Sequence, residues 1–370
     1  MIPLKLVAAN DVVGALLALG SALAGECAVF VTAPEVNGKM PETHGLPNTV
    51  ESHVALIVES SGSTGTPKRI TLSRSALLAS ARAADSRLGG PGQWLVALPI
   101  NYVAGSNVLI RSLVAETQPV IMNTQLPFTP EAFSNAAGLM TGERRYVSLV
   151  PVQLQRLVNA AAIDELLLTR LRRFDAILVG GQAIDEKTAA KASQIGLKLV
   201  RSYGSAETAG GCCYDGIPLE GVGLRISPEG RIEVSGPTLA EGVAGADGWY
   251  STSDLGEIVN GVLRVSGRAN RVLNSGGLKV ALDAIEEAVR AIGGVNDVAA
   301  IAVSDEQWGE RAAVIYTGSP EVADYIAADA LTQLGPAAKP VRVVRVDAIP
   351  RLSSGKTDYQ LLTKQLSDRG

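Results

Sequence analysis

Residues 60–68 bring together hydroxyl groups, glycines and one cation, which are the groups that bind phosphate. They read Ser60-Ser61-Gly62-Ser63-Thr64-Gly65-Thr66-Pro67-Lys68. Glycines let the backbone approach an anion, successive N–H groups form a concave nest, and the hydroxyls and the lysine add donors. The segment follows residues 54–58, whose apolar and β-branched composition predicts a buried strand. We therefore expect it to hold a polyphosphate rather than to form a plain surface loop.

A second stretch, Ser354-Gly355-Lys356-Thr357, looks superficially like the end of a Walker A loop. That loop requires a glycine five positions before the glycine of the Gly-Lys pair, and Pro350 occupies this position. The pattern around it also predicts no strand-to-helix turn. A P-loop nucleotide hydrolase is therefore excluded.

The elements that must position these residues alternate along the first two thirds of the chain. Short apolar runs predict strands at residues 54–58, 94–98, 146–150, 176–179 and 198–202. Longer amphipathic runs predict helices at residues 73–87, 103–115, 130–138, 151–161 and 185–195. This alternation is typical of buried parallel strands joined by crossover helices.

The pattern changes after residue 221. Residues 221–266 predict an antiparallel sheet, in a small barrel or sandwich, with a hairpin at Asn260-Gly261. The remainder predicts a separate α+β unit. Its expected hairpin joins 271–274 to 278–280 over Ser275-Gly276-Gly277, and its other elements are helices at 282–292 and 320–334 and strands at 298–303, 312–316 and 341–346. We expect an α/β protein with a large N-terminal domain of mostly parallel sheets and a small antiparallel subdomain (residues 1–267), followed by a small α+β domain (268–370).

The composition and net charge of the chain exclude several classes of binding partner. The net charge is −4 and the pI is about 5.5, so no basic surface for nucleic acid or an anionic membrane is expected. Three cysteines, two of them adjacent, and two histidines indicate a reducing compartment and no structural zinc. Residues 12–30 could pass for a signal peptide. Glu26 interrupts the apolar run, which favours a core helix at 11–23, a strand at 28–32, no membrane span and a cytoplasmic protein.

The phosphate-binding segment resembles the signature of the adenylate-forming superfamily, which includes acyl-CoA synthetases, adenylation domains and luciferases. Five further motifs of that family follow in order. They are Gly180-Gly181-Gln182, Tyr203-Gly204-Ser205-Ala206-Glu207, Tyr250-Ser251-Thr252-Ser253-Asp254, Gly267-Arg268-Ala269-Asn270 and Pro350-Arg351-Leu352-Ser353-Ser354-Gly355-Lys356. Each motif alone is weak, but six in order cover most of the chain after residue 54.

The resemblance implies a role for each motif. Gly180, Gly181 and Gln182 would lie along the adenine of ATP, Tyr203 would stack on it, and Gly204 and Ser205 would adjoin the phosphates. Glu207 would hold Mg²⁺, Asp254 would bind the ribose hydroxyls, and Arg268 would complete the nucleotide site. Lys356 would be the catalytic lysine of a mobile C-terminal domain that turns at Asn270. Gly276 and Gly277 would line a channel for coenzyme A, besides forming a hairpin turn.

Three positions depart from the family pattern. Tyr102 stands where the family usually has histidine, Ala206 where a hydroxyl residue usually contacts phosphate, and Asn270 where the hinge is usually aspartate. Tyrosine can stack and hydrogen-bond, and asparagine keeps a polar residue that tolerates turns. We expect the nucleotide site to be retained.

Residues 98–112 and 207–216 are similar to two stretches of the o-succinylbenzoate–CoA ligase subfamily, where they line the acyl pocket. Tyr102, Ser106 and Asn107 would form the wall, and Gly210 and Gly211 would leave room for an aromatic acid. Arg111 would either pair with the second carboxylate of a dicarboxylic substrate or lie on the surface of a helix.

Other functions stay open at this point. The chain could serve another aryl or medium-chain acid, or load a carrier protein. A catalytically silent binding module is disfavoured because Lys356, Glu207 and Asp254 are all present. The oligomeric state is open, with a homodimer as one option.

Overall fold

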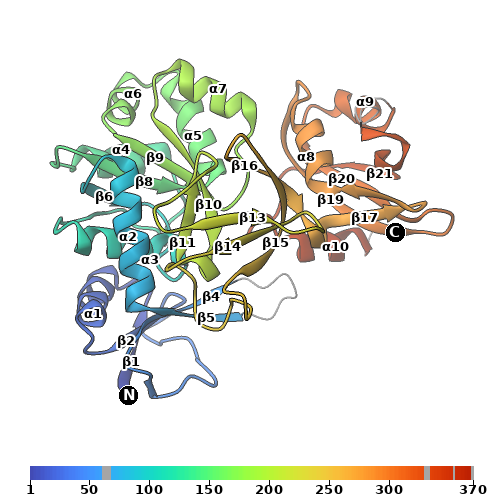
Figure 1. Cartoon of the computed structure of the whole chain (residues 1–370). Coiled ribbons are helices and arrows are strands. Elements are labelled where there is room, and N and C mark those ends of the chain that lie inside the picture. The colour runs from blue at the N-terminus through green and yellow to red at the C-terminus, as the bar shows by residue number, and fades with distance from the viewer. Residues whose placement is uncertain (61–67, 329–333, 353–354, 368–370) are drawn as a thin grey trace. The chain divides into compact units, whose positions relative to one another are not determined.

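The computed structural model describes residues 1–60, 68–328, 334–352 and 355–367. The chain forms two compact units (Figure 1). The first consists of Met1–Ile184, Thr188–Leu224 and Val234–Tyr250, and the second of Asp185–Lys187, Arg225–Glu233 and Ser251–Gly370. The predicted domain boundary at residues 267 and 268 falls within the second unit and stays a prediction.

A seven-stranded sheet forms the centre of the first unit, in the order β12-β11-β10-β9-β8-β6-β7. Its strands are β6 (Gln93–Val96), β7 (Val120–Ile121), β8 (Arg145–Leu149), β9 (Ala176–Gly180), β10 (Leu199–Ser205), β11 (Gly210–Tyr214) and β12 (Ile217–Pro218). The pairs from β7 to β10 are parallel, whereas β11 and β12 are antiparallel. This arrangement confirms the predicted parallel strands and adds β7, β11 and β12, which the sequence interpretation missed.

Helices cover both faces of this sheet, which explains why its central strands are apolar throughout. One face contacts α3 (Val103–Val114), beside α2 (Arg74–Leu88). The other packs Phe133, Leu154 and Leu171 into one core with the strands. These three side chains come from α4 (Pro130–Gly138), α5 (Pro151–Ala161) and α6 (Glu165–Arg172), and α7 (Glu186–Gln194) precedes β10.

A second, five-stranded sheet has the order β3-β1-β2-β4-β5. It contains β1 (Ile2–Ala8), β2 (Ala28–Thr32), β3 (Thr49–Val50), β4 (Val54–Ser60) and β5 (Lys68–Ser73), with α1 (Val12–Ala24) packed against it. The core helix and strand predicted within residues 11–32 are confirmed by α1 and β2.

The strand predicted at residues 54–58 is confirmed as β4, which pairs parallel with β2. It lies in a different sheet from residues 94–98, and on its other side it pairs antiparallel with β5, where the register places Ser60 opposite Lys68. Residues 61–67 therefore connect two antiparallel strands. The buried Ile70 and Leu72 alternate with more exposed neighbours in β5, a period-two pattern that could have identified this strand.

A four-stranded sheet, in the order β13-β14-β15-β16, forms the predicted antiparallel region. Its strands are β13 (Gly223–Ile226), β14 (Arg231–Ser235), β15 (Tyr250–Val259) and β16 (Val262–Arg268). Asn260 and Gly261 join β15 to β16 with φ angles of 52° and 78°. Two positive φ angles are those of a type I′ hairpin, as the Asn-Gly pair predicts.

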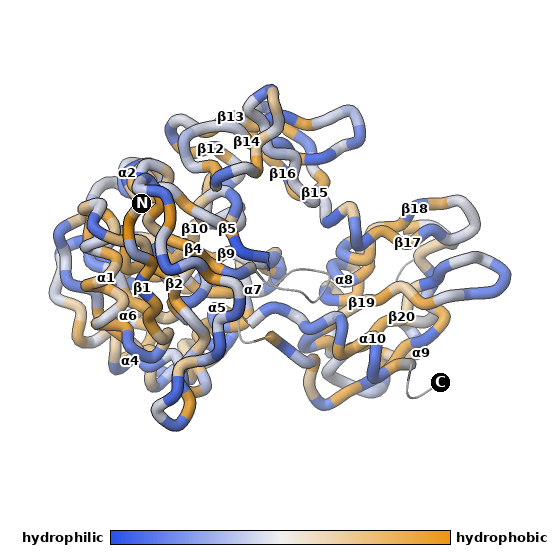
Figure 2. The backbone as a smooth tube through the Cα atoms, turned by 90° about the horizontal axis from the view of Figure 1, so that it is seen from below, coloured by the Kyte–Doolittle hydropathy of each residue, from blue (hydrophilic) through white to orange (hydrophobic). Residues whose placement is uncertain are grey.

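The last hundred residues are built on a sheet of β17 (Val272–Ser275), β18 (Leu278–Ala281), β19 (Val295–Asp305), β20 (Gly309–Gly318) and β21 (Arg342–Arg345). Side chains of β19 alternate between two cores. Val298 and Ala300 pack with α8 (Leu282–Arg290), whereas Ala299 and Ile301 pack with α10 (Tyr359–Ser367). Figure 2 shows hydrophobic stretches along β19 and β20. The helix predicted at 320–334 begins as a 3₁₀ turn and continues as α9 (Ala323–Ala328), and residues 329–333 lie outside the described residues.

Candidate active site

The predicted phosphate-binding segment is described only at its ends. Ser61, Gly62, Ser63, Thr64 and Gly65 lie outside the described residues. Ser60 ends β4 and Lys68 begins β5. Next to them, Arg69 Nε lies 3.3 Å from Glu59 Oε1.

Two of the predicted nucleotide motifs lie side by side at the carboxyl ends of neighbouring parallel strands. Gly180 ends β9 and pairs in register with Ser202 of β10, so Gly181 and Gln182 leave the sheet next to Tyr203. A Cβ on Gly180 would lie 2.8 Å from the Ser202 carbonyl oxygen, which accounts for glycine here. The carboxyl ends of parallel strands are where open α/β sheets bind ligands.

Tyr203 continues into a tight turn that carries Glu207. The turn is the 3₁₀ segment η1 (Ala206–Thr208), and Ala209 ends it with a φ of 52°, which is costly for a residue with a Cβ. Two buried side chains hold the Ala209 carbonyl: Asn107 Nδ2 donates to it at 2.8 Å and Ser80 Oγ at 3.0 Å. Backbone strain that is maintained by surrounding contacts is common at functional sites.

The Ser205 hydroxyl is buried and has no hydrogen-bond partner within the described residues, and its backbone N–H donates to Thr208 Oγ1 at 2.9 Å. Its predicted contact with ATP stays a prediction. Gly204 lies against the Gly210 carbonyl, where a Cβ would collide with that oxygen.

Glu207 fits a magnesium site. Its side chain is half-buried, and within the described residues no hydrogen bond or ion pair engages its carboxylate. No group of three His, Cys, Asp or Glu gathers around a common point in the described ranges. Mg²⁺ commonly takes one or two carboxylates and completes its shell with phosphate oxygens and water, so a single carboxylate at this turn suffices.

The predicted acyl-pocket residues of α3 are mostly interior. Tyr102, the residue before the helix, is half-buried, whereas Ser106 and Asn107 are fully buried. Ser106 Oγ donates to the Ile100 carbonyl at 2.6 Å, and Asn107 serves the Ala209 carbonyl. Both side chains are engaged by backbone carbonyls, and their predicted place in the wall of the acyl pocket stays a prediction.

Arg111 does not lie on the helix surface, and its role toward a second carboxylate of the substrate stays a prediction. The side chain is only 4% exposed, its Cζ lies 4.9 Å from the centre of the Trp94 ring, and Nη2 donates to the Tyr214 hydroxyl at 3.1 Å. Burial raises the pKa of the nearby Asp85 carboxyl, and the Arg111 charge opposes that rise. Arg111 is therefore an internal cation, because sequence spacing places it on the inner face of the helix.

Gly210 and Gly211 are closely packed where a Cβ would lie, and their predicted role in admitting an aromatic acid stays a prediction. A Cβ on Gly210 (φ 95°) would collide with Asn107 Nδ2, and one on Gly211 would lie 2.8 Å from the Tyr214 ring and even closer to Ser202 Oγ. Close internal packing explains both glycines.

In the second unit, Asp254 and Arg268 face each other across β15 and β16. They are paired in the strand register, and Arg268 Nε lies 3.3 Å from Asp254 Oδ1. The Asp254 side chain is 19% exposed, so the carboxylate can accept further hydrogen bonds. The structure thus brings together two of the predicted nucleotide residues.

The predicted hinge and channel residues occupy turns. Asn270 is exposed within the 3₁₀ segment η2 (Ala269–Arg271). Gly276 and Gly277 form the β17–β18 hairpin turn with φ angles of 59° and 83°. A Cβ on Gly276 would lie 2.7 Å from the Trp308 ring, whereas the space beside Gly277 is open.

Lys356 is half-buried and lies on a turn whose two sides are joined by backbone hydrogen bonds. Leu352 N–H donates to the Lys356 carbonyl at 2.8 Å, and Arg351 forms a β-bridge with Thr357. Arg351 also reaches Asp297 at 2.5 Å and the Gly355 carbonyl at 3.1 Å. The sequence interpretation missed Arg351 and Asp297, since an ion pair 54 residues apart leaves no local pattern.

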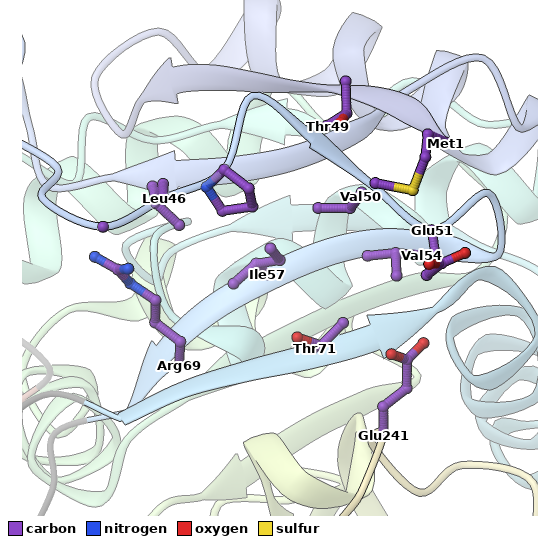
Figure 3. A pocket seen from close by; sticks show the side chains of 12 residues that line it. Met1, Leu46, Thr49, Val50, Glu51, Val54, Ile57, Arg69, Thr71 and Glu241 are labelled. Atoms are coloured by element: carbon purple, nitrogen blue, oxygen red, sulfur yellow. The ribbon is translucent and has the colours of Figure 1, made fainter.

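One cavity of the described structure, with a volume of about 380 Å³, lies elsewhere. Figure 3 shows Ile57 of β4 and Arg69 and Thr71 of β5 around it, with Leu46 and Val50. None of the predicted site residues lines it. Among the described helices, none combines the length and apolar character that crossing a membrane would need.

Two family profiles match the chain. The AMP-binding enzyme profile covers residues 11–242, and the profile of the AMP-binding enzyme C-terminal domain covers residues 284–356. This chain belongs to the AMP-binding enzyme family. The resemblance to the adenylate-forming superfamily and the predicted fold class are thereby confirmed.

Several individual proteins are similar to this chain. The chain is 36% identical to the probable 2-succinylbenzoate–CoA ligase of Mycobacterium tuberculosis, over 95% of this chain and 94% of that enzyme. It is 29% identical to the Escherichia coli 2-succinylbenzoate–CoA ligase, over 71% of this chain and 58% of that enzyme. A variant of E. coli MenE with bound OSB-AMS superposes with a TM-score of 0.78 at 22% identity, covering 100% of this chain and 88% of that one. At that identity the superposition establishes a common fold.

Proposed function

We propose that this chain is an ATP-dependent ligase that activates 2-succinylbenzoate (o-succinylbenzoate) as an acyl-adenylate, releases pyrophosphate and transfers the acyl group to coenzyme A. The observation that carries the proposal is the 36% identity to a probable 2-succinylbenzoate–CoA ligase along nearly the full length of both chains. The presence of Lys356, Glu207 and Asp254 is consistent with it. The product would serve menaquinone biosynthesis in the cytoplasm.

In the first half-reaction, a carboxylate oxygen of the acid attacks the α-phosphorus of ATP, and the bond to the pyrophosphate oxygen breaks. Both reactants are anions, so a positioned cation must offset their repulsion. The Lys356 ammonium takes that role. When bound, Mg²⁺ supplies further positive charge to the phosphates, and Glu207 is the residue that would hold it.

The predicted nucleotide residues take the roles that the family resemblance gives them. Tyr203 stacks on adenine beside Gly180–Gln182, and the Asp254 carboxylate accepts hydrogen bonds from the ribose hydroxyls. Arg268, 3.3 Å from Asp254, orients that carboxylate. The segment 60–68 supplies donors to the phosphates.

In the second half-reaction, the sulfur of coenzyme A attacks the acyl carbonyl, and AMP leaves with the bridging oxygen. Residues 268–370 would turn at Asn270 between the two steps, withdrawing Lys356 and presenting the Gly276–Gly277 turn. Open space beside Gly277 supports this reading, since a pantetheine arm needs a narrow channel.

The test is a coupled assay on the purified full chain. With ATP, Mg²⁺, coenzyme A and 2-succinylbenzoate, we expect pyrophosphate release matched by the acyl-CoA thioester in chromatography. Benzoate and a medium-chain acid serve as comparison substrates. Absence of pyrophosphate with 2-succinylbenzoate would refute the substrate, and adenylate without thioester would indicate transfer to a carrier protein.

A further inference from the structure

A buried cluster in the second unit joins the segment around Asn270 to the turn that carries Lys356. The Arg271 guanidinium lies over the Tyr359 ring, with Cζ 3.7 Å from the ring centre, and Nη2 donates to Glu286 Oε1 at 2.5 Å. The Tyr359 hydroxyl donates to the same carboxylate at 3.0 Å. One carboxylate therefore binds a residue next to Asn270 and a residue three positions after Lys356.

The cluster is buried and charged, so it tolerates few alternative arrangements. The side chains of Arg271 and Glu286 are 12% and 9% exposed. Burial raises the pKa of Glu286, while the Arg271 charge and the Ala300 N–H, 2.8 Å away, oppose the rise. A buried network in which each member satisfies another favours one geometry, because any unpaired member is costly.

The same cluster holds the backbone before Arg271. Asp283, in the first turn of α8, accepts from Arg271 Nε at 2.6 Å and from the Arg268 N–H at 3.0 Å. The segment 268–271 is thus bound to α8 at two points, and Glu286 lies one turn further along that helix.

The Lys356 turn is held at both limbs. Its first limb is fixed through Arg351, which binds Asp297 of β19. Its second limb continues directly into Tyr359, the first residue of α10. The Asp358 N–H donates to the Pro350 carbonyl at 2.9 Å and closes the base of the turn. Displacing Tyr359 would therefore displace Lys356.

We propose that Glu286 and Tyr359 are positioning residues that keep the Lys356 turn in register with segment 268–271, so that the lysine is presented for adenylation. This inference rests on the proposed function. The competing account is that the cluster only stabilises the fold of this unit.

Tyr359→Phe in the full chain separates these accounts, because it removes the hydroxyl and keeps the ring over Arg271. Misplacing a group that acts in the transition state lowers kcat more than it raises KM, so we expect kcat for adenylation to fall about tenfold. The KM for ATP and the rate of thioester formation from preformed adenylate should stay within about twofold.

Tyr316→Phe is the matched control. Tyr316 is fully buried in the same unit, and its hydroxyl donates to the Ser319 carbonyl at 3.2 Å, away from the Lys356 turn. This variant should leave both half-reactions unchanged. Equal losses in the two variants, or equal losses in the two half-reactions of Tyr359→Phe, would overturn the proposal.

Two further variants extend the test, and the second of them does not depend on the folding of Tyr359→Phe. In the double variant Tyr359→Phe/Glu286→Gln, adenylation should fall no further than in the more affected single variant, because the two residues share one contact. Arg351→Lys keeps a charge near Asp297 but lacks the planar guanidinium whose two nitrogens bond Asp297 and the Gly355 carbonyl, so the same selective loss is expected. An inactive wild type would refute the proposed function, whereas an active wild type with unaffected variants would refute only this inference.

Discussion

Two turns carry the proposed chemistry, and they are held by different kinds of contact. The turn bearing Glu207 is fixed by neutral hydrogen bonds, in which Asn107 and Ser80 hold the carbonyl of the strained Ala209. The turn bearing Lys356 is fixed by charged groups on both limbs. Removing one partner of a buried neutral hydrogen bond lowers the free energy of unfolding by about 1–3 kcal/mol. Removing one partner of a buried ion pair lowers it by more. The comparison indicates that substitutions at the second turn should cost more than substitutions at the first, because they leave buried charges unpaired.

The largest effect is expected for Lys356→Ala. Removing the ammonium that offsets the anionic transition state should lower adenylation by about 10²–10³-fold. Thioester formation from preformed adenylate should be largely spared, since the lysine has then been withdrawn. Rapid-quench measurement of both half-reactions tests this prediction. An equal loss of rate in both would contradict a role of Lys356 in adenylation alone.

An intermediate effect is expected for Asn107→Ala. The Ala209 carbonyl loses its 2.8 Å donor, and the free energy of unfolding should fall by about 1–3 kcal/mol in urea denaturation. Ser112→Ala is the control, because Ser112 is a buried hydroxyl on the same helix that bonds only the Val108 carbonyl. If the control loses as much stability, the Ala209 carbonyl has no special importance.

The smallest effect is expected for Ala209→Gly. Glycine relieves the positive φ of 52° but adds entropy to the unfolded chain, so the two terms nearly cancel. The free energy of unfolding should change by less than about 1 kcal/mol. A larger loss would mean that the Ala209 methyl group packs in a way that matters more than its backbone strain.

Local sequence patterns predicted most elements of this fold. Buried parallel strands such as β9 and hairpins such as Asn260-Gly261 follow from apolar runs and turn residues. The pairing of β4 was not predictable in this way, because the apolar residues of a strand do not specify which strand lies beside it. The strand β5 was not recognised because it directly follows the predicted phosphate-binding segment.

The candidate site was predictable where a motif is contiguous, as at Tyr203–Glu207. The orientation of side chains on α3 was not, and Arg111 points inward because Trp94, Tyr214 and Asp85 together make a place for a buried cation. Contacts such as Arg271–Glu286–Tyr359 join residues up to 88 positions apart and have no signature in a single sequence.

Isotope transfer tests the central claim most directly. The purified enzyme is given ATP, coenzyme A and 2-succinylbenzoate labelled with ¹⁸O in its carboxylates. If an acyl-adenylate forms, the oxygen that attacks the α-phosphorus leaves with AMP, and mass spectrometry should find one ¹⁸O in AMP for each thioester made. Unlabelled AMP, or ADP and phosphate in its place, would contradict adenylation.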